Sequence, residues 1–318
     1  MKVIQTKIRT IDYYRLSNLE AIKIGENTPF DIFIKKDNDY VIIIKAGTFL
    51  SESLHKKLQK QTSLYIFKKD KEKLALSCDT LKYYIKHNRE NYAKRLEFLY
   101  KINNKIFNDF LESRYNKIDL EGVNQIVKSI LYLVKYDSNF LKNTILHFIN
   151  DHNLPNHSLH VAIYAMSLGN DLSLNTKSLL HLGTAGLLHD IGLKKINKEL
   201  INKKAKLNIA ELKDIQKHVS FSVEILRQNN LYNPLILDAV MHHHELYNGE
   251  GYPEKLQEGE ISVFASILSI GDVFDALTSE RPHRKQYSSF EAIKMMLKDV
   301  SMVNNFNHRY LHLLLKAI

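Results

Sequence analysis

The chain has 318 residues, of which 44% are hydrophobic, so it can form one large domain or two ordinary ones. Its formal net charge is +10, and lysine and arginine outnumber acidic residues by 23 to 14 in residues 1–115 but only by 22 to 21 in the remainder. These N-terminal lysines are scattered, without an arginine-rich helix or interleaved aromatic residues, which favours a solvated surface over a nucleic-acid polymer as partner.

The apolar stretches do not indicate a membrane protein. The longest ones, which begin at Val41 and Ile261, are well short of the roughly 20 residues that a bilayer span requires. The N-terminus has neither the apolar segment nor the cleavage site of a signal peptide. A single cysteine, Cys78, rules out an internal disulfide and fits a reducing compartment. We therefore expect a cytoplasmic protein without a membrane span.

The first 80 residues are expected to form a small α+β module. Residues 30–47 alternate at Phe30, Ile32 and Ile34, pass through a polar turn and continue as a β-branched run, which predicts a hairpin. Residues 63–68 are a third strand candidate, and the LHKKLQKQ segment before them is expected to be helical. The module has no glycine loop suited to phosphate and no acidic phospho-acceptor cluster, so we assign it a sensory or regulatory role.

From Leu81 onward, the spacing of the apolar residues becomes helical. We expect one amphipathic connecting helix over residues 81–115, which either packs on the next domain or supports a homodimer. Two more helices are predicted at residues 119–136 and 140–150. The apolar residues of the remaining chain also have helical spacing, except in predicted loops at 197–207 and 247–260. Residues 116–318 are therefore predicted to form an all-α domain, and the fold class is mostly α.

The histidines of this second part are the most informative feature of the sequence. A lone histidine on an apolar helix is usually structural, but a set of this size is difficult to explain in that way. The set consists of His157, His160, His181, His189, His218, His242, His243, His244 and His283.

Two aspartates accompany these histidines in apolar surroundings. Asp190 follows His189 in a helix that must be buried, and a buried carboxylate is costly unless a cation or hydrogen-bond donors compensate it. A divalent metal ion is the natural partner, because imidazole and carboxylate ligands suit Fe, Mn, Zn, Co or Ni, and a carboxylate can bridge two ions. Asp272 lies in a similar apolar helix and is interpreted as a metal ligand, whereas Asp275, one turn later, is given a structural role. His243 and His244 can reach one ion only because the helix ends there.

Four segments in this order, LLHDIG, KHVSFS, HHELYNGEGYP and ILSIGDVFDALTSERPHR, resemble the HD-GYP family of HD-domain metal-dependent phosphohydrolases. The resemblance covers about half of the chain, from Leu154 to the C-terminal region. The DIFIK and YVIIIKAG segments are loosely similar to the small module that precedes this domain in some members.

The resemblance implies two divalent metal ions, Fe or Mn, with Asp190 bridging them. His157 is preferred to His160 because NHSLHVA matches the H-x-x-R-V-A pattern of the family with His157 at the ligand position. Asn153 stands where some members have a glutamate for a third ion, which favours two. The implied ligands are His157, His189 and Asp272 on one ion, His218, His243 and His244 on the other, and Asp190 on both.

The resemblance further implies hydrolysis of cyclic di-GMP to pGpG or GMP by a hydroxide that bridges the metals. Asp190, Lys194 and Arg281 are the implied catalytic residues. The implied substrate contacts are Gly251, Tyr252, Arg281 and Arg284, and the GYP loop is also a candidate surface for protein partners.

One departure from the family bears on the rate of catalysis. The family usually has a lysine after HDIG, but this chain has Leu193, and Lys194 can replace that lysine only if the helix has ended at Gly192. The alternative to an enzyme is therefore a weak or inactive cyclic di-GMP receptor or partner-binding regulator. A third reading, a phosphohydrolase acting on another nucleotide, is disfavoured by the GYP loop.

Overall fold

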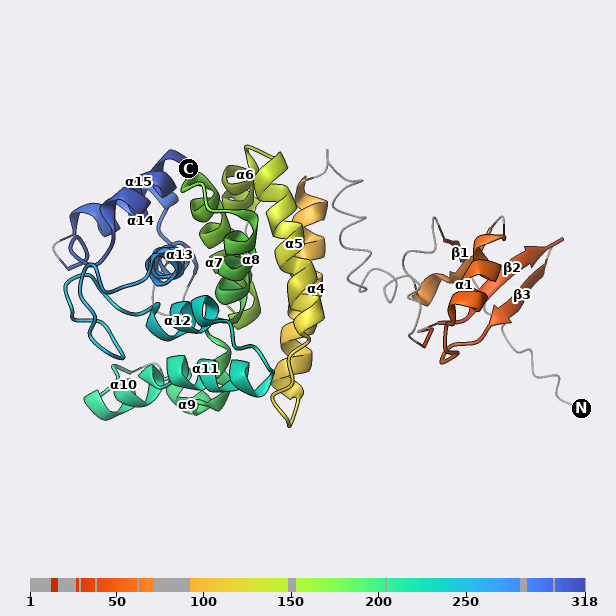
Figure 1. The fold of residues 1–318 in the computed structure, drawn as a ribbon, viewed down its shortest axis with the longest axis horizontal. Coiled ribbons are helices and arrows are strands. Elements are labelled where there is room, and N and C mark those ends of the chain that lie inside the picture. Colours follow the sequence, from red (N-terminus) through yellow and green to blue (C-terminus); the bar gives the residue numbers. More distant parts are fainter. Residues whose placement is uncertain are drawn as a thin grey trace, which may run out of the picture. The chain divides into compact units, whose positions relative to one another are not determined.

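The computed structural model describes most of the chain. The chain divides into two units, residues 1–87 and 88–318. The described residues are 13–16, 27–28, 30–37, 39–61, 63–70, 92–147, 153–203, 205–280, 285–299 and 301–317. The predicted start of the long helix at Leu81 and the single cysteine Cys78 lie outside these ranges. Figure 1 shows the helices and strands of both units.

The first unit contains a four-stranded antiparallel sheet with the order β1-β4-β2-β3. Its strands are β1 (Tyr13–Arg15), β2 (Ile32–Lys36), β3 (Asp39–Ile44) and β4 (Tyr65–Phe67). The predicted hairpin is β2 and β3, and the third predicted strand is β4. β1 was not predicted, because three residues are too few to show an alternation of period two.

Among the residues of the first unit that the structure describes, one helix and one short 3-10 turn accompany this sheet. Helix α1 (Glu52–Gln59) coincides with the predicted helical segment, and Ser51 caps its N-terminus by accepting a hydrogen bond from the Leu54 amide. The 3-10 turn η1 spans Lys68–Asp70. The core of the unit consists of the buried residues Leu16, Phe30, Ile32, Ile44, Leu50, Leu58, Leu64 and Ile66.

The second unit is helical in its described parts and begins with three helices. These are α4 (Tyr92–Glu112), α5 (Leu120–Tyr136) and α6 (Phe140–His147). Asp119 caps α5 by accepting from the Gly122 amide, as expected for an aspartate directly before an apolar helical run. Because α4 packs against α5, α6 and α7, it lies within the second unit, whereas the sequence-based division set residues 81–115 apart as a connector.

Three buried helices form the centre of this unit: α7 (Leu154–Asp171), α8 (Thr176–Leu188) and α13 (Val263–Thr278). The backbones of α7 and α8 approach closely at Gly186, where an added Cβ would lie 2.7 Å from the Cα of Ala162. A glycine is therefore needed at this crossing. The close approach holds the C-terminal end of α8, where His189 follows, against the helix that carries His157.

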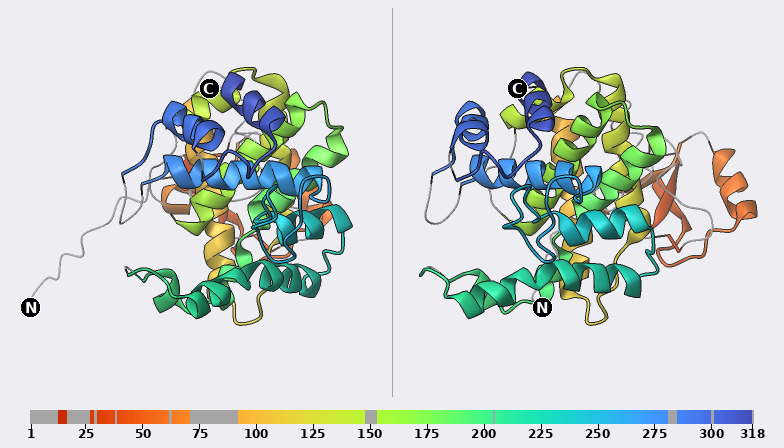
Figure 2. Two further views of the ribbon diagram at one scale, coloured as in Figure 1. Left: turned by 90° about the vertical axis from the view of Figure 1, so that its left-hand side faces the viewer. Right: turned by 60° about the vertical axis from the view of Figure 1, so that its left-hand side comes forward.

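The remaining helices surround this centre (Figures 1 and 2). They are η2 (Ile191–Lys195), α9 (Lys198–Ile201), α10 (Ile209–Gln216), α11 (His218–Gln228), α12 (Pro234–His242), α14 (Ser289–Lys298) and α15 (His308–Ala317). The 3-10 turn η2 packs against α11, and α11 packs against α12. The short helix α9 corrects the prediction of a loop at 197–207, because Asn197 caps a single turn there. Residues 247–260 are irregular, as predicted, apart from a bridge between Asn248 and Gln257.

Among the described residues, no helix is long and apolar enough to cross a bilayer.

Candidate metal centre

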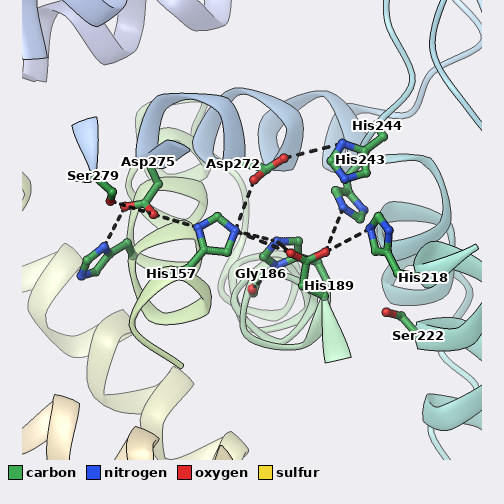
Figure 3. Close-up of polar contacts among 12 residues, drawn as sticks. His157, Gly186, His189, His218, Ser222, His243, His244, Asp272, Asp275 and Ser279 are labelled. Carbon is green, nitrogen blue, oxygen red and sulfur yellow. Dashed lines mark hydrogen bonds and ion pairs between the residues drawn. The ribbon is translucent and has the colours of Figure 1, made fainter. Parts of the chain in front are cut away.

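The seven predicted ligands come together in the second unit from five separate elements. His157 lies on α7, His189 and Asp190 follow α8, and His218 begins α11. His243 and His244 directly follow α12, and Asp272 lies on α13. Their ligand atoms form two adjoining groups (Figure 3). One group is His157, His189 and Asp272, and the other is Asp190, His218, His243 and His244.

Asp190 lies between the two groups and turns one carboxylate oxygen toward each. Its Oδ1 is 3.1 Å from His218 Nε2 and 3.6 Å from His243 Nε2. Its Oδ2 is 3.5 Å from His189 Nε2 and 3.8 Å from His157 Nε2. The carboxylate therefore has the orientation that bridging two ions requires.

Three of the histidines are oriented in the same way by a carbonyl of the helical turn that precedes them. His189, His218 and His243 each place Nδ1 2.8–2.9 Å from the backbone carbonyl three residues earlier. A carbonyl can only accept, so Nδ1 carries the proton and donates, and the lone pair of Nε2 faces the cluster. Helix ends supply such carbonyls, because their last turn lacks intrahelical partners.

His157 is oriented by a carboxylate rather than by a carbonyl. Its Nδ1 lies 2.8 Å from Asp275 Oδ2, and its Nε2 lies 3.2 Å from both Asp272 Oδ1 and His189 Nε2 (Figure 3). His160, the alternative ligand, lies outside both groups and instead places its Nδ1 2.7 Å from Asp275 Oδ1. The geometry thus brings His157, and not His160, to the cluster.

The cluster strongly perturbs the protonation of its members. Burial by itself would raise the pKa of Asp190, but His189 and His218 hold that pKa well below its usual value. Burial lowers the pKa of His189 to about 4, so its ring is neutral at pH 7, as a metal ligand must be. Burial also opposes protonation of His157, yet its hydrogen bonds to Asp272 and Asp275 raise its pKa well above the usual value.

The donors present fit divalent metal ions. Asp190 Oδ1, His218 Nε2 and His243 Nε2 are buried, and among the described residues no hydrogen bond satisfies them, because these facing atoms are all acceptors. Buried polar atoms in folded proteins are rarely left without a partner, so these atoms indicate a ligand. Imidazole nitrogens and carboxylate oxygens are ligands of borderline transition metals, whereas calcium prefers oxygen.

The GYP loop covers the same cluster through Tyr252. The ring of Tyr252 stacks on His244 with centroids 4.7 Å apart and lies 6.3 Å from the ring of His218. Glu245, which is 1% exposed, holds the loop by accepting from the amides of Glu254 and Leu256 at 2.6 and 3.0 Å. Its position in the HHE segment was visible in the sequence, but its role was not predicted.

Gly251 has a packing role that the sequence did not suggest. An added Cβ would lie 2.4 Å from the Leu246 amide nitrogen and 2.5 Å from the Cα of Glu245. The loop can therefore close on this helix end only with a glycine at position 251.

The predicted catalytic lysine points elsewhere. Lys194 Nζ donates to the carbonyls of Phe110 and Ser113, each at 2.6 Å, and lies 4.4 Å from the centroid of the Phe110 ring. These carbonyls belong to the end of α4, where acceptors are unpaired and attract a cation. The ammonium of Lys194 is thus engaged in a structural contact, and its catalytic role stays a prediction. Arg281 and Arg284 lie outside the described residues.

Together, the fold and the site define a helical protein with a buried histidine and aspartate centre suited to two metal ions. Residues 138–302, more than half of the chain, match the HD domain family. The chain therefore belongs to that family. The HDIG, HHE and GYP segments, which carry the resemblance to the HD-GYP group, all fall within this range.

Curated relatives match about half of the chain. A cyclic di-GMP phosphodiesterase of Pseudomonas aeruginosa is 32% identical over 179 residues, which are 56% of this chain and 43% of that protein. The 3′3′-cGAMP-specific phosphodiesterase 1 of Vibrio cholerae is 37% identical over 145 residues, which are 46% of this chain and 33% of that protein. The matched parts thus span less than half of these relatives.

The fold is also similar to a solved structure, an HDG“Y”P protein from Bdellovibrio bacteriovorus. The TM-score is 0.61 at 16% sequence identity, and the similarity covers 95% of this chain and 98% of that chain. At this identity the similarity concerns the fold alone.

Proposed function

We propose that the chain is a metal-dependent phosphodiesterase that hydrolyses a cyclic dinucleotide, with cyclic di-GMP as its substrate. The observation that carries the proposal is the divided cluster, in which Asp190 directs one oxygen to each group of ligands. The activities named for the two relatives, on cyclic di-GMP and on 3′3′-cGAMP, support a cyclic dinucleotide as the substrate class.

The ligands are assigned to two ions. His157, His189 and Asp272 would hold the first, His218, His243 and His244 would hold the second, and Asp190 would contribute to both. Two ions are favoured over three because the side chain of Asn153 caps α7, where it accepts from the Asn156 amide. We propose Fe or Mn, because both suit mixed imidazole and carboxylate ligands.

The residues of the chain prepare this centre for phosphodiester hydrolysis. When bound, two divalent ions supply an acidified water and neutralise the charge that develops on the phosphate oxygens. The carbonyl and carboxylate partners at Nδ1 fix the ligand rings, so the centre is organised before the substrate arrives. Tyr252 provides an aromatic face beside His244 for the substrate. Arg281 and Arg284 are proposed as phosphate contacts because a guanidinium fork fits phosphate oxygens.

The balanced reaction adds one water to one phosphodiester bond. The water oxygen bonds to phosphorus, the bond to the ribose O3′ breaks, and O3′ receives a proton. The product is the linear dinucleotide pGpG, and a second hydrolysis gives GMP.

A second candidate is a cyclic di-GMP receptor or partner-binding regulator with little or no turnover. Leu193 stands where the family usually has a lysine, and the neighbouring Lys194 is bound to α4. These two observations favour a slow reaction. In that case the GYP loop around Tyr252 would serve as the surface to which protein partners bind.

The test is anaerobic purification, loading with Fe(II) or Mn(II), and incubation with cyclic di-GMP or 3′3′-cGAMP, with the products followed by chromatography. Metal-dependent appearance of pGpG or GMP is expected from cyclic di-GMP. Asp190→Ala should lose at least one metal per chain and all turnover, whereas Asp109→Ala, at an exposed position on α4, should behave as the wild type. Intact nucleotide retained by a chain with two metals would support the receptor. Retention of two metals by Asp190→Ala would contradict the bridging role.

A further inference from the structure

A row of buried hydrogen bonds connects α4 to the candidate metal centre. The hydroxyl of Tyr100 on α4 lies 2.5 Å from His160 Nε2, and His160 Nδ1 lies 2.7 Å from Asp275 Oδ1. The other oxygen of Asp275, Oδ2, lies 2.8 Å from Nδ1 of His157, whose Nε2 faces the cluster. All four side chains are at most 6% exposed. Only His157 belongs to the predicted ligand set, so the other three require an explanation.

The chemistry of these groups gives the row a single direction. An ionised Asp275 can only accept, so both histidines donate to it from Nδ1. The Nε2 of a neutral His160 is then an acceptor, and the hydroxyl of Tyr100 donates to it. Nε2 of His157 faces the cluster, and a His157 that binds metal there is neutral, with its proton on Nδ1. Every proton in the row has an acceptor, and Asp275 also faces the hydroxyl of Ser279 at 3.4 Å (Figure 3).

We propose that Tyr100 and His160 are positioning residues that fix the ring of His157 for metal binding by holding the carboxylate of Asp275 from its far side. The inference rests on the proposed metal centre. A carboxylate held at one oxygen alone can rotate about its terminal bond, which has broad energy wells. Because His160 holds Oδ1 while His157 binds Oδ2, the plane of the carboxylate is fixed and so is the histidine ring that it orients.

The placement of these residues makes α4 part of the support of the centre. His157 and His160 are three residues apart and therefore lie on one face of α7, so Asp275 can bind both at once. Tyr100 comes from a different helix and completes the row. The end of α4 also receives the ammonium of Lys194, four residues after Asp190. α4 is thus tied to the neighbourhood of the centre at two points, and its position and the orientation of His157 depend on one another.

The test is titration of the metal-free full-length chain with Mn(II). Binding is measured as the loss of the electron paramagnetic resonance signal of free Mn(II). Glutamine and asparagine separate the two ends of His160, because the glutamine amide nitrogen replaces Nε2 and the asparagine amide nitrogen replaces Nδ1. His160→Gln, which loses the donor to Asp275, should weaken one of the two Mn(II) sites about 10- to 100-fold. His160→Asn and Tyr100→Phe, which lose the hydrogen bond between the two side chains but keep the donor to Asp275, should weaken the same site about 2- to 10-fold.

Tyr92→Phe is the matched control, because Tyr92 lies on the same helix and its hydroxyl donates to the Phe140 carbonyl on α6 instead. It should leave both Mn(II) sites unchanged. The inference would be overturned if Tyr100→Phe weakened both Mn(II) sites equally and lowered the melting temperature as much as Tyr92→Phe does. That result would show a general structural role for Tyr100. Wild-type binding of two Mn(II) with unchanged affinities in the His160 variants would overturn the inference alone. A wild type that binds no Mn(II) would overturn the proposed function as well.

Discussion

Gly192→Ala tests whether the turn after Asp190 must pack directly on α11. The φ angle of Gly192 is not in the left-handed region, so alanine can adopt the backbone conformation and the obstacle is space alone. An added Cβ would lie 2.1 Å from the His218 carbonyl oxygen and 2.5 Å from the Ser222 amide nitrogen. Ordinary contact begins near 3.4 Å, so the carbonyl would have to retreat by 1.3 Å, the difference between 3.4 and 2.1 Å.

The expected loss of stability follows from these contacts. Overpacking of this kind costs about 1–3 kcal/mol. The hydrogen bond from the Gly192 amide to the Ser222 hydroxyl, 2.8 Å long, would be strained at the same time and adds about 1 kcal/mol. For a unit of this size, a loss of about 2–4 kcal/mol lowers the melting temperature by about 4–16 °C. Because His218 begins the displaced helix, one Mn(II) site should also weaken.

The assays are scanning calorimetry and Mn(II) titration of the full chain. Gly271→Ala is the control, because the atom nearest to its added Cβ, in the Tyr164 side chain, would still be 3.3 Å away. It should change the melting temperature by no more than a few degrees, about 1 kcal/mol in free energy. If Gly192→Ala melts and binds Mn(II) like the wild type, the reasoning from close packing is wrong.

Three further substitutions test the surroundings of the centre. Lys194→Met removes the hydrogen bonds to α4 and should lower the melting temperature by about 2–4 °C, while turnover stays within a few-fold of the wild type. A hundredfold loss of turnover at unchanged melting temperature would instead support a catalytic role for Lys194. Leu193→Lys should speed hydrolysis of cyclic di-GMP at least about tenfold if the missing lysine limits the rate, and an unchanged rate would show that another group serves. Glu245→Gln should raise KM and speed amide exchange in residues 247–260 while two metals remain bound, because the loop loses its carboxylate acceptor; unchanged exchange would argue against this role.

Local features of the sequence predicted most of the helices and the members of the candidate site. The spacing of apolar residues placed the start of α5 at residue 119, one residue before its observed start at Leu120. The order of the HDIG, HHE and GYP segments pointed to the residues that the structure brings into two adjoining groups. Such features are readable because helix periodicity, capping and turn chemistry depend on residues only a few positions apart.

Only the tertiary structure decided which side chains contact residues that are far away in the sequence. Asp275 was predicted to be structural, yet it orients His157 from 118 positions away. Lys194 was predicted to be catalytic, yet it binds carbonyls 81 and 84 positions earlier. The need for glycine at position 192 likewise depends on a helix that begins only at His218. These contacts arise from the packing of whole helices, because the same local sequence can present its side chains to different neighbours, and only the assembled core selects one.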